Sequence, residues 1–361
     1  MALHCGIIGI KGSGKTTLFN SLSGIKAETS KYSEKANIGI IKVPDNRLYE
    51  LEKFQKTEKI VHATVNLVDI PGLLTGTGST DNTQKFLNDV RNCDALIHVV
   101  RCFDNPLNPH PNGSVNPIRD IENIEIELQA RDIESIEKKI QRLEKHVKGG
   151  NKELKAHLDA LIYIKSQLEN FVSIKNLNLK DIEREAIADL FLLTAKPMLY
   201  VANVDSNSVA NGNNYSKSLS EYLKSRNESC LIIAAELEAE IAELESIEDR
   251  MMFLADAGLN EPGVNRLLQM AYKMLNLITF FTVGPKEIKA WTIREGTKAP
   301  QAAGVIHSDL EKGFIRAEVM KYNDFVTLGG EHACKEKGKF YIEGKNYVVQ
   351  DGDILHIRFN V

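Results

Sequence analysis

The sequence predicts an α/β protein with a mostly parallel sheet, a long helical insertion and a small C-terminal α+β domain. In the first half, short β-branched and leucine-rich runs alternate with helical patterns, as strands buried on both faces of a parallel sheet require. Between residues 120 and 194, apolar residues recur at helical spacing. After residue 278, short strand-like runs are separated by turn residues. A chain of 361 residues is too long for one core, so two or three domains are expected.

The elements follow from these patterns in chain order. Core strands are predicted at 5–10, 64–69, 95–101, 198–203 and 230–234, with helices at 16–23, 84–92 and 215–226. Two periodic runs, 121–143 and 154–171, flank Gly149 and Gly150 and predict an antiparallel helical hairpin that projects from the core. The tail predicts strands at 280–283, 290–293, 313–319, 347–349 and 354–359. We therefore expect a core domain of 1–119 and 195–277, a helical insertion of 120–194 and a C-terminal domain of 278–361.

Composition narrows the class of protein. With 45 basic and 49 acidic side chains, the formal charge is -4, so no overall positive field favours DNA binding. The five cysteines are scattered and form no CxxC pair, which predicts neither disulfides nor a zinc site. The first residues lack the pattern of a signal peptide, and no apolar run is long enough to span a bilayer. We expect a cytoplasmic protein without a membrane partner.

The strongest local signal lies at residues 9–16, GIKGSGKT, which fit the phosphate-loop pattern G-x-x-x-x-G-K-[ST]. The segment follows an apolar strand and opens a helix, so backbone N–H groups can point at phosphate oxygens. Lys15 is expected to bridge the β- and γ-phosphates, and the Thr16 hydroxyl to bind Mg²⁺. The alternative, a glycine-rich turn with a solvated lysine, does not need these flanking elements. The pattern predicts a nucleoside triphosphatase.

A second motif, Asp69-Ile-Pro-Gly72, ends the strand predicted at 64–69. Asp69 is expected to hold Mg²⁺ through water, and the Gly72 N–H to contact the γ-phosphate, so Lys15 and Gly72 are the predicted catalytic groups. The next residue is Leu73, where related enzymes often carry a glutamine that orients water. A leucine cannot orient water, so intrinsic hydrolysis should be slow.

The base-binding loop is predicted after the strand at 198–203. Guanine-specific domains have Asn-Lys-x-Asp there, and the last carboxylate accepts two donors from guanine; this chain has Asn203-Val-Asp-Ser206. A serine cannot make that bidentate acceptor, which disfavours guanine. Asp205 would replace the carboxylate only if the loop shifted by one residue.

These motifs resemble those of the YchF / Obg-like ATPase family, and the resemblance runs through essentially the whole chain. Later segments carry it too: 238–244 (EAEIAEL), 259–263 (LNEPG), 289–292 (KAWT), 299–304 (APQAAG) with His307, 314–317 (FIRA), 351–353 (DGD) and 359–361 (FNV). The resemblance implies a Ras-like P-loop core, an inserted α-helical coiled coil and a C-terminal TGS domain of β-grasp type. It also implies ATP hydrolysis in preference to GTP and association with the ribosome, through its large subunit or as a whole, with rRNA as one candidate contact.

The resemblance also places residues in the site. It implies that adenine is contacted by Asn203 and Val204, and that Ala235 and Glu236 lie near the second base-contacting loop. The residues expected to bind the phosphates are Gly12, Ser13, Gly14, Lys15, Thr16 and Thr17. Three features differ from the family: Ser206 replaces a glutamate, Gly12-Ser13 replaces an Asn-Val pair, and the first switch lacks its usual run. In that switch Ser33 is the candidate for the magnesium-binding hydroxyl.

Three functions stay open at this point. The favoured one is a ribosome-associated, Mg²⁺-dependent ATPase that acts as a conformational switch. The first alternative is a translation GTPase that uses Asp205 for guanine. The second is a ribosome- or RNA-binding module whose nucleotide site is only structural.

Overall fold

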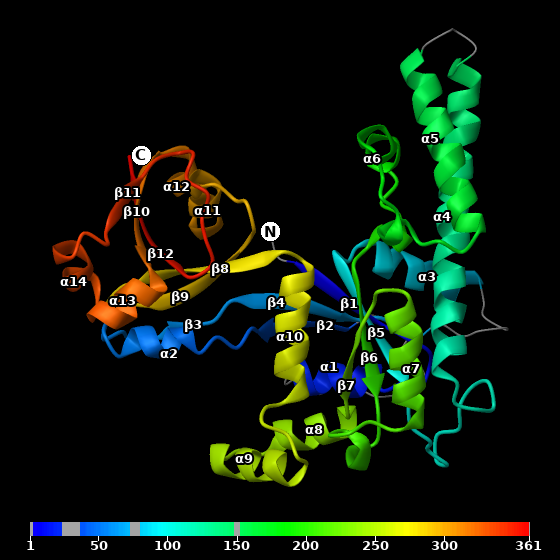
Figure 1. Cartoon of the computed structure of the whole chain (residues 1–361), viewed down its shortest axis with the longest axis horizontal. Coiled ribbons are helices and arrows are strands. Elements are labelled where there is room, and N and C mark those ends of the chain that lie inside the picture. Colours follow the sequence, from blue (N-terminus) through cyan, green and yellow to red (C-terminus); the bar gives the residue numbers. More distant parts are fainter. Residues whose placement is uncertain (1–2, 24–36, 73–79, 148–151, 361) are drawn as a thin grey trace. The chain divides into compact units, whose positions relative to one another are not determined.

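The computed structural model describes residues 3–23, 37–72, 80–147 and 152–360, so Ser33 and Leu73 lie outside the described residues. The chain divides into two compact units, one of residues 3–39 and 67–264 and the other of 40–66 and 265–361. Figure 1 shows the elements of both units. Among the described residues, no helix is long and apolar enough to cross a membrane.

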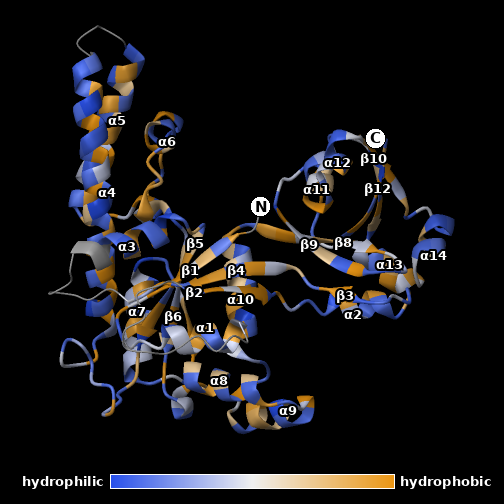
Figure 2. Ribbon diagram, turned by 180° about the vertical axis from the view of Figure 1, so that it is seen from behind, coloured by the Kyte–Doolittle hydropathy of each residue, from blue (hydrophilic) through white to orange (hydrophobic). Residues whose placement is uncertain are grey.

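The larger unit is built on a six-stranded sheet in the order β2-β4-β1-β5-β6-β7. The strands are β1 (His4–Ile8), β2 (Asn37–Lys42), β4 (Thr64–Asp69), β5 (Ala95–Arg101), β6 (Met198–Asn203) and β7 (Cys230–Ile233). Pairing is parallel from β1 through β5 and β6 to β7. All seven residues of β5 are buried, and Figure 2 colours β4 and β6 as largely hydrophobic. The predicted α/β fold with a mostly parallel sheet is confirmed.

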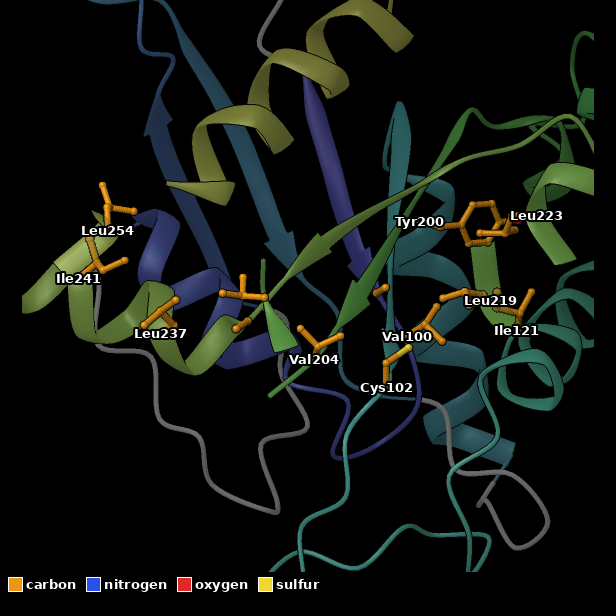
Figure 3. Close-up of a cluster of buried hydrophobic side chains, with 13 residues drawn as sticks. Val100, Cys102, Ile121, Tyr200, Val204, Leu219, Leu223, Leu237, Ile241 and Leu254 are labelled. Carbon is orange, nitrogen blue, oxygen red and sulfur yellow. The ribbon is translucent and has the colours of Figure 1, made fainter. Parts of the chain in front are cut away.

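Two apolar clusters cover this sheet. The helices of the unit that pack around it are α1 (Lys15–Ser23), α3 (Thr80–Arg91), α7 (Asn214–Ser225), α8 (Ala235–Glu243) and α9 (Ile247–Asp256). One cluster joins residues of β1, β4 and β5 to Phe86, Leu87 and Val90 of α3. The other joins Val100 and Tyr200 to Leu219 and Leu223 of α7 and to Leu237 and Ile241 of α8, as Figure 3 shows. Helices on both sides therefore hold the strand ends in place.

The insertion is a helical hairpin of α4 (Pro117–Val147) and α5 (Lys152–Glu169), followed by α6 (Asp181–Ile187) and short 3-10 turns at Ile174–Asn176 and Leu193–Ala195. The two long helices lie side by side in Figure 1 and share an apolar core around Ile136, Leu161 and Ile164. The start of α4 does not project, because Ile121, Ile124 and Leu128 are buried in the two clusters of the sheet. The projecting hairpin is thus shorter than its helical pattern suggests.

The smaller unit contains a second sheet in the order β11-β10-β12-β8-β9-β3. Its strands are β3 (Ile60–Val61), β8 (Leu277–Val283), β9 (Ile288–Arg294), β10 (Phe314–Lys321), β11 (Tyr341–Glu343) and β12 (Asp353–Phe359). Its helices are α2 (Arg47–Glu52), α11 (Ala299–Ile306), α12 (Ser308–Lys312), α13 (Tyr322–Leu328) and α14 (Glu331–Glu336), and α10 (Gly263–Met274) leads into it. The mixed sheet packs against Ala299, Ala302 and Ala303 of α11, in keeping with the β-grasp domain that the family resemblance implies. The strand predicted at 347–349 is wrong, because only an isolated bridge between Lys298 and Val348 forms there.

Residues 40–66 contribute to this smaller unit, although they include the end of β2 and the start of β4, two strands of the first sheet. Strand β3 pairs in parallel with β9. Arg47 donates to Asp351 at 2.7 Å and stacks over the ring of Phe281, and Asp351 also accepts from the Thr279 N–H at 2.9 Å. The C-terminal unit thus takes in a segment that the sequence assigns to the core domain, and it begins near residue 265 rather than 278. The three-domain division itself stays a prediction.

Candidate nucleotide-binding site

The phosphate loop occupies the six residues between the end of β1 at Ile8 and the start of α1 at Lys15. Three glycines, Gly9, Gly12 and Gly14, have positive φ angles of 151°, 79° and 91°, which side chains other than glycine rarely adopt. At Gly14 a Cβ atom would lie 2.2 Å from Nδ2 of Asn203. The loop therefore has the strand–loop–helix geometry in which backbone N–H groups can surround phosphates.

Lys15 opens α1, and its ammonium group is buried against the loop. The side chain is 6% exposed, and Nζ donates to the carbonyl oxygen of Ile10 at 2.8 Å. Burial lowers the pKa of Lys15 to about 8, and the nearby Asp69 opposes that shift. The buried ammonium group of Lys15 is therefore expected to bind a negatively charged phosphate oxygen more strongly than the neutral carbonyl of Ile10.

Thr16 and Asp69 form the second part of the site. The Thr16 hydroxyl donates to Oδ2 of Asp69 at 2.8 Å, and Nδ2 of Asn37 lies 3.5 Å from the same oxygen. The other carboxylate oxygen, Oδ1, is buried and has no hydrogen-bond partner among the described residues. Burial raises the pKa of Asp69, while Lys15, Thr16 and Asn37 act against that rise. An unpartnered carboxylate oxygen beside a hydroxyl is a hard-oxygen donor set that fits Mg²⁺.

Gly72 lies directly against the phosphate loop. A Cβ atom at this position would be 2.8 Å from Nζ of Lys15 and 2.9 Å from the backbone nitrogen of Lys11. The structure therefore brings together Lys15 and Thr16 from one part of the chain and Asp69 and Gly72 from another. A larger residue at position 72 would push into the space beside the lysine.

Asn203, at the end of β6, connects the phosphate loop to the next helix. Its Nδ2 donates to the carbonyl oxygen of Ser13 at 2.8 Å, and its Oδ1 accepts from the N–H of Ala235, the first residue of α8, at 2.9 Å. The side chain is 3% exposed. Both polar atoms of the amide are thus used to hold the loop and α8 together.

The other residues expected near the base differ in the burial and hydrogen bonding of their side chains. Val204 is buried in the apolar cluster of Figure 3, and Ala235 is buried at the start of α8, so neither side chain is exposed. Glu236 is exposed. The Asp205 carboxylate accepts from the Ser208 hydroxyl, at 3.0 and 2.8 Å from its two oxygens. Of the remaining phosphate-loop residues, Thr17 is half-buried, and the buried Ser13 hydroxyl has no partner among the described residues.

Arg101 is a residue of this site that the sequence patterns do not identify. It ends β5, is 1% exposed, and donates to three backbone carbonyls, including that of Gly12 in the phosphate loop at 3.4 Å. An arginine at the end of an apolar strand usually points to solvent, so neither the pattern nor the spacing predicts this contact.

Similarity to known proteins covers both units. Residues 4–146 match the family model MMR_HSR1, described as 50S ribosome-binding GTPase, and residues 277–360 match YchF-GTPase_C, described as "Protein of unknown function (DUF933)". The chain is 44% identical to "Ribosome-binding ATPase YchF" of Haemophilus influenzae over 100% of both sequences.

The chain belongs to the YchF family.

Other members of the YchF family support the same assignment at greater distance. The Bacillus subtilis protein, also named "Ribosome-binding ATPase YchF", is 41% identical over 100% of both sequences. The solved structure of the Schizosaccharomyces pombe YchF GTPase superposes with a TM-score of 0.88 at 32% identity, covering 99% of this chain and 97% of that one. The names of these YchF proteins differ in the nucleotide: the two bacterial relatives are named ATPases, and the yeast protein is named a GTPase.

Proposed function

We propose that this chain is a ribosome-binding nucleoside triphosphatase that binds Mg²⁺ and ATP at the phosphate loop and hydrolyses ATP slowly. The observation that carries the proposal is the convergence of Lys15, Thr16, Asp69 and Gly72 around residues 9–14. Association with the ribosome rests on the names of the relatives. A cytoplasmic location follows from that association.

The catalytic contribution of the chain is electrostatic. Lys15 gives up its bond to the Ile10 carbonyl and places its ammonium group on the β- and γ-phosphates, and the phosphate charge favours the protonated amine. Backbone N–H groups of the loop and of Gly72 donate to the oxygens on which charge develops. Thr16 and Asp69 would hold Mg²⁺, which when bound neutralises charge on the β- and γ-phosphate oxygens. Leu73 offers no group to orient the attacking water, so turnover without a partner is slow.

The choice of ATP over GTP rests on the loop after β6. Ser206 stands where guanine-specific domains place a carboxylate, and Asp205 has both oxygens engaged by Ser208. Reading guanine through Asp205 would cost those contacts as well as a shift of the loop. The GTPase alternative is therefore disfavoured, although the yeast structure carries a GTPase name.

Competition at equilibrium tests the choice of nucleotide. A fluorescent ATP analogue bound in the presence of Mg²⁺ is displaced by unlabelled ATP or GTP. We expect ATP to bind at least about tenfold more tightly, on the order of 1.4 kcal/mol. Tighter binding of GTP would transfer the base contact to Asp205 and replace the ATPase assignment by a GTPase.

Sedimentation with ribosomes tests the switch against a binding module with a structural nucleotide site. Wild type and Lys15→Ala are compared with ATP, with ADP and without nucleotide. A switch predicts that nucleotide changes the bound fraction of the wild type and has no effect on Lys15→Ala. If nucleotide changes neither protein, and both bind equally, the chain is a ribosome-binding module.

A further inference from the structure

The loop after β5 is fixed to the phosphate loop by one buried guanidinium group. Arg101 donates from Nε to the carbonyl of Phe103 at 3.1 Å, from Nη2 to that of Asn108 at 2.8 Å and from Nη1 to that of Gly12 at 3.4 Å. No carboxylate forms an ion pair with it among the described residues. All three acceptors are backbone oxygens, so the bonds depend on the path of the chain and not on neighbouring side chains.

The loop itself has little conformational freedom. The Asn105 side chain accepts from the N–H groups of Leu107 and Asn108, at 2.9 and 3.2 Å. Asn105 and Asn108 both precede prolines, which restricts their backbones to extended conformations. At the far end, His110 is buried and bonded to Asp120 of α4 at 2.9 Å. Residues 103–110 are therefore held at both ends and in the middle.

This arrangement places the Asn108 side chain over the phosphate loop. A Cβ atom at Gly12 would lie 3.1 Å from Nδ2 of Asn108 and 3.3 Å from Nη1 of Arg101. The Asn108 side chain is half-buried, and no hydrogen bond among the described residues uses its carboxamide. The Nδ2 donors of Asn108, which no hydrogen bond among the described residues uses, therefore lie beside Gly12. Gly12 is also the phosphate-loop residue whose carbonyl accepts from Arg101.

We propose that Asn108 is a nucleotide-contacting residue whose amide donates to phosphate oxygens of the bound triphosphate, and that Arg101 is the positioning residue that holds it there. The inference rests on the proposed function, because it needs a nucleotide at the phosphate loop. A neutral amide suits this place, since it donates to anionic oxygens without the desolvation cost of adding a further cation to the two that are already buried here, Lys15 and Arg101. The glycine at position 12 is what leaves room for it.

The simplest competing role for Asn108 is to shape its own loop. That role uses its backbone, which the Arg101 and Asn105 contacts already fix, and it would make any side chain tolerable at position 108. The two roles differ in their response to charge. A carboxylate of the same shape would repel the phosphates, whereas loop shape would be unchanged.

Affinity for a fluorescent ATP analogue with Mg²⁺ is therefore measured for the full chain as wild type, Asn108→Ala and Asn108→Asp. Leu107→Ala is the matched control, since Leu107 is on the same loop and 91% exposed. We expect about a tenfold loss for Asn108→Ala, the scale of one hydrogen bond to a charged group. The loss should be larger for Asn108→Asp, and Leu107→Ala should bind within twofold of wild type. Thermal melting should be unchanged in all three variants.

Affinities of both Asn108 variants within twofold of wild type would overturn the inference and leave the proposed function intact. Absence of ATP binding by the wild type would overturn both. The positioning role is tested by Arg101→Lys, because an ammonium group cannot bond the three carbonyls in this geometry. In that background Asn108→Ala should cost less than twofold; a full tenfold loss there would refute positioning by Arg101. Should Arg101→Lys fail to fold, the Asn108 variants alone decide the contact.

Discussion

The Thr16 hydroxyl donates a hydrogen bond to Oδ2 of Asp69 at 2.8 Å, although 53 positions separate the two residues. The bond joins the first turn of α1 to the end of β4, and it leaves Oδ1 of Asp69 buried without a partner among the described residues. Two oxygens that are expected to serve one metal ion thus already touch, and one carboxylate oxygen is still available.

Asp69→Asn should therefore abolish the effect of Mg²⁺ on ATP binding without destabilising the fold. Burial raises the pKa of Asp69, so the ionised form is less favourable in the folded than in the unfolded chain, and the folded state loses stability as pH rises through that pKa. An amide removes this loss, so the melting temperature at pH 7 should stay level or rise. Mg²⁺ should improve ATP affinity of the wild type by about tenfold or more, roughly 1.4 kcal/mol, and have no effect on the variant. A lower melting temperature with Mg²⁺ dependence retained would contradict this role.

The second prediction concerns pH and Lys15. Its pKa of about 8 means that the amine is charged at neutral pH and loses its proton above that value. ATP affinity should be constant below pH 7 and fall as the pH rises above 8, by at most about tenfold per unit. Lys15→Met should bind weakly and show no such fall.

Stability should respond to the same group with the opposite sign. Because the folded-state pKa lies below the ordinary value of 10.5, the unfolded chain binds more protons between the two values, and the native state gains stability as pH rises through this range. The difference in melting temperature between wild type and Lys15→Met should follow this trend. A flat difference across pH 8 to 10 would mean that the Lys15 amine is not desolvated.

The local sequence predicts most of the core but not the partners of its edge segments. Strands β4, β5 and β6 have the predicted bounds, because each is an apolar run buried on both faces. The sequence does not predict strand β3, because its two residues pair with β9, far along the chain, and no local pattern encodes that pairing. Near residue 348, only Val349 is buried, and it forms no strand ladder; its N–H is bonded to the carbonyl of Thr297 at 3.0 Å.

The nucleotide site likewise combines residues that local motifs predict with residues that only long-range contacts bring to it. The phosphate loop and Asp69-Ile-Pro-Gly72 are contiguous motifs, so their meeting follows from the order of parallel strands. Arg101 and Asn108 belong to no motif, and their contact with Gly12 depends on the path of a proline-containing loop. Val204 is part of a motif, yet its side chain faces the core, because residues just after a buried strand can still be covered by neighbouring helices.

The third prediction isolates the close approach at Gly14. Gly14→Ala adds a Cβ atom 2.2 Å from the Asn203 amide at a φ of 91°, whereas Gly113→Ala has a similar φ of 79° and open space. The control should lose about 1 kcal/mol of unfolding free energy from backbone strain alone. Gly14→Ala should lose more than the control and should also fail to bind ATP. Urea unfolding and ATP titration of both variants check this, and equal losses would show that the Asn203 contact adds nothing.

The last prediction separates loop support from base recognition. Asn203→Ala leaves the Ser13 carbonyl and the Ala235 N–H without their partner, which should cost about 2–4 kcal/mol of unfolding free energy. Because Nδ2 and Oδ1 of Asn203 both hold the loop and α8 together, affinities for ATP and GTP should fall by the same factor. Glu236→Ala is the matched variant, since its side chain is exposed beside Ala235. If Glu236 contacts the base, this change should alter the ratio of ATP to GTP affinity. The free energy of unfolding should stay within about 0.5 kcal/mol of wild type, the usual range for surface substitutions. A changed ratio in Asn203→Ala instead would make Asn203 a direct base contact, and would require its amide to leave Ser13 when nucleotide binds.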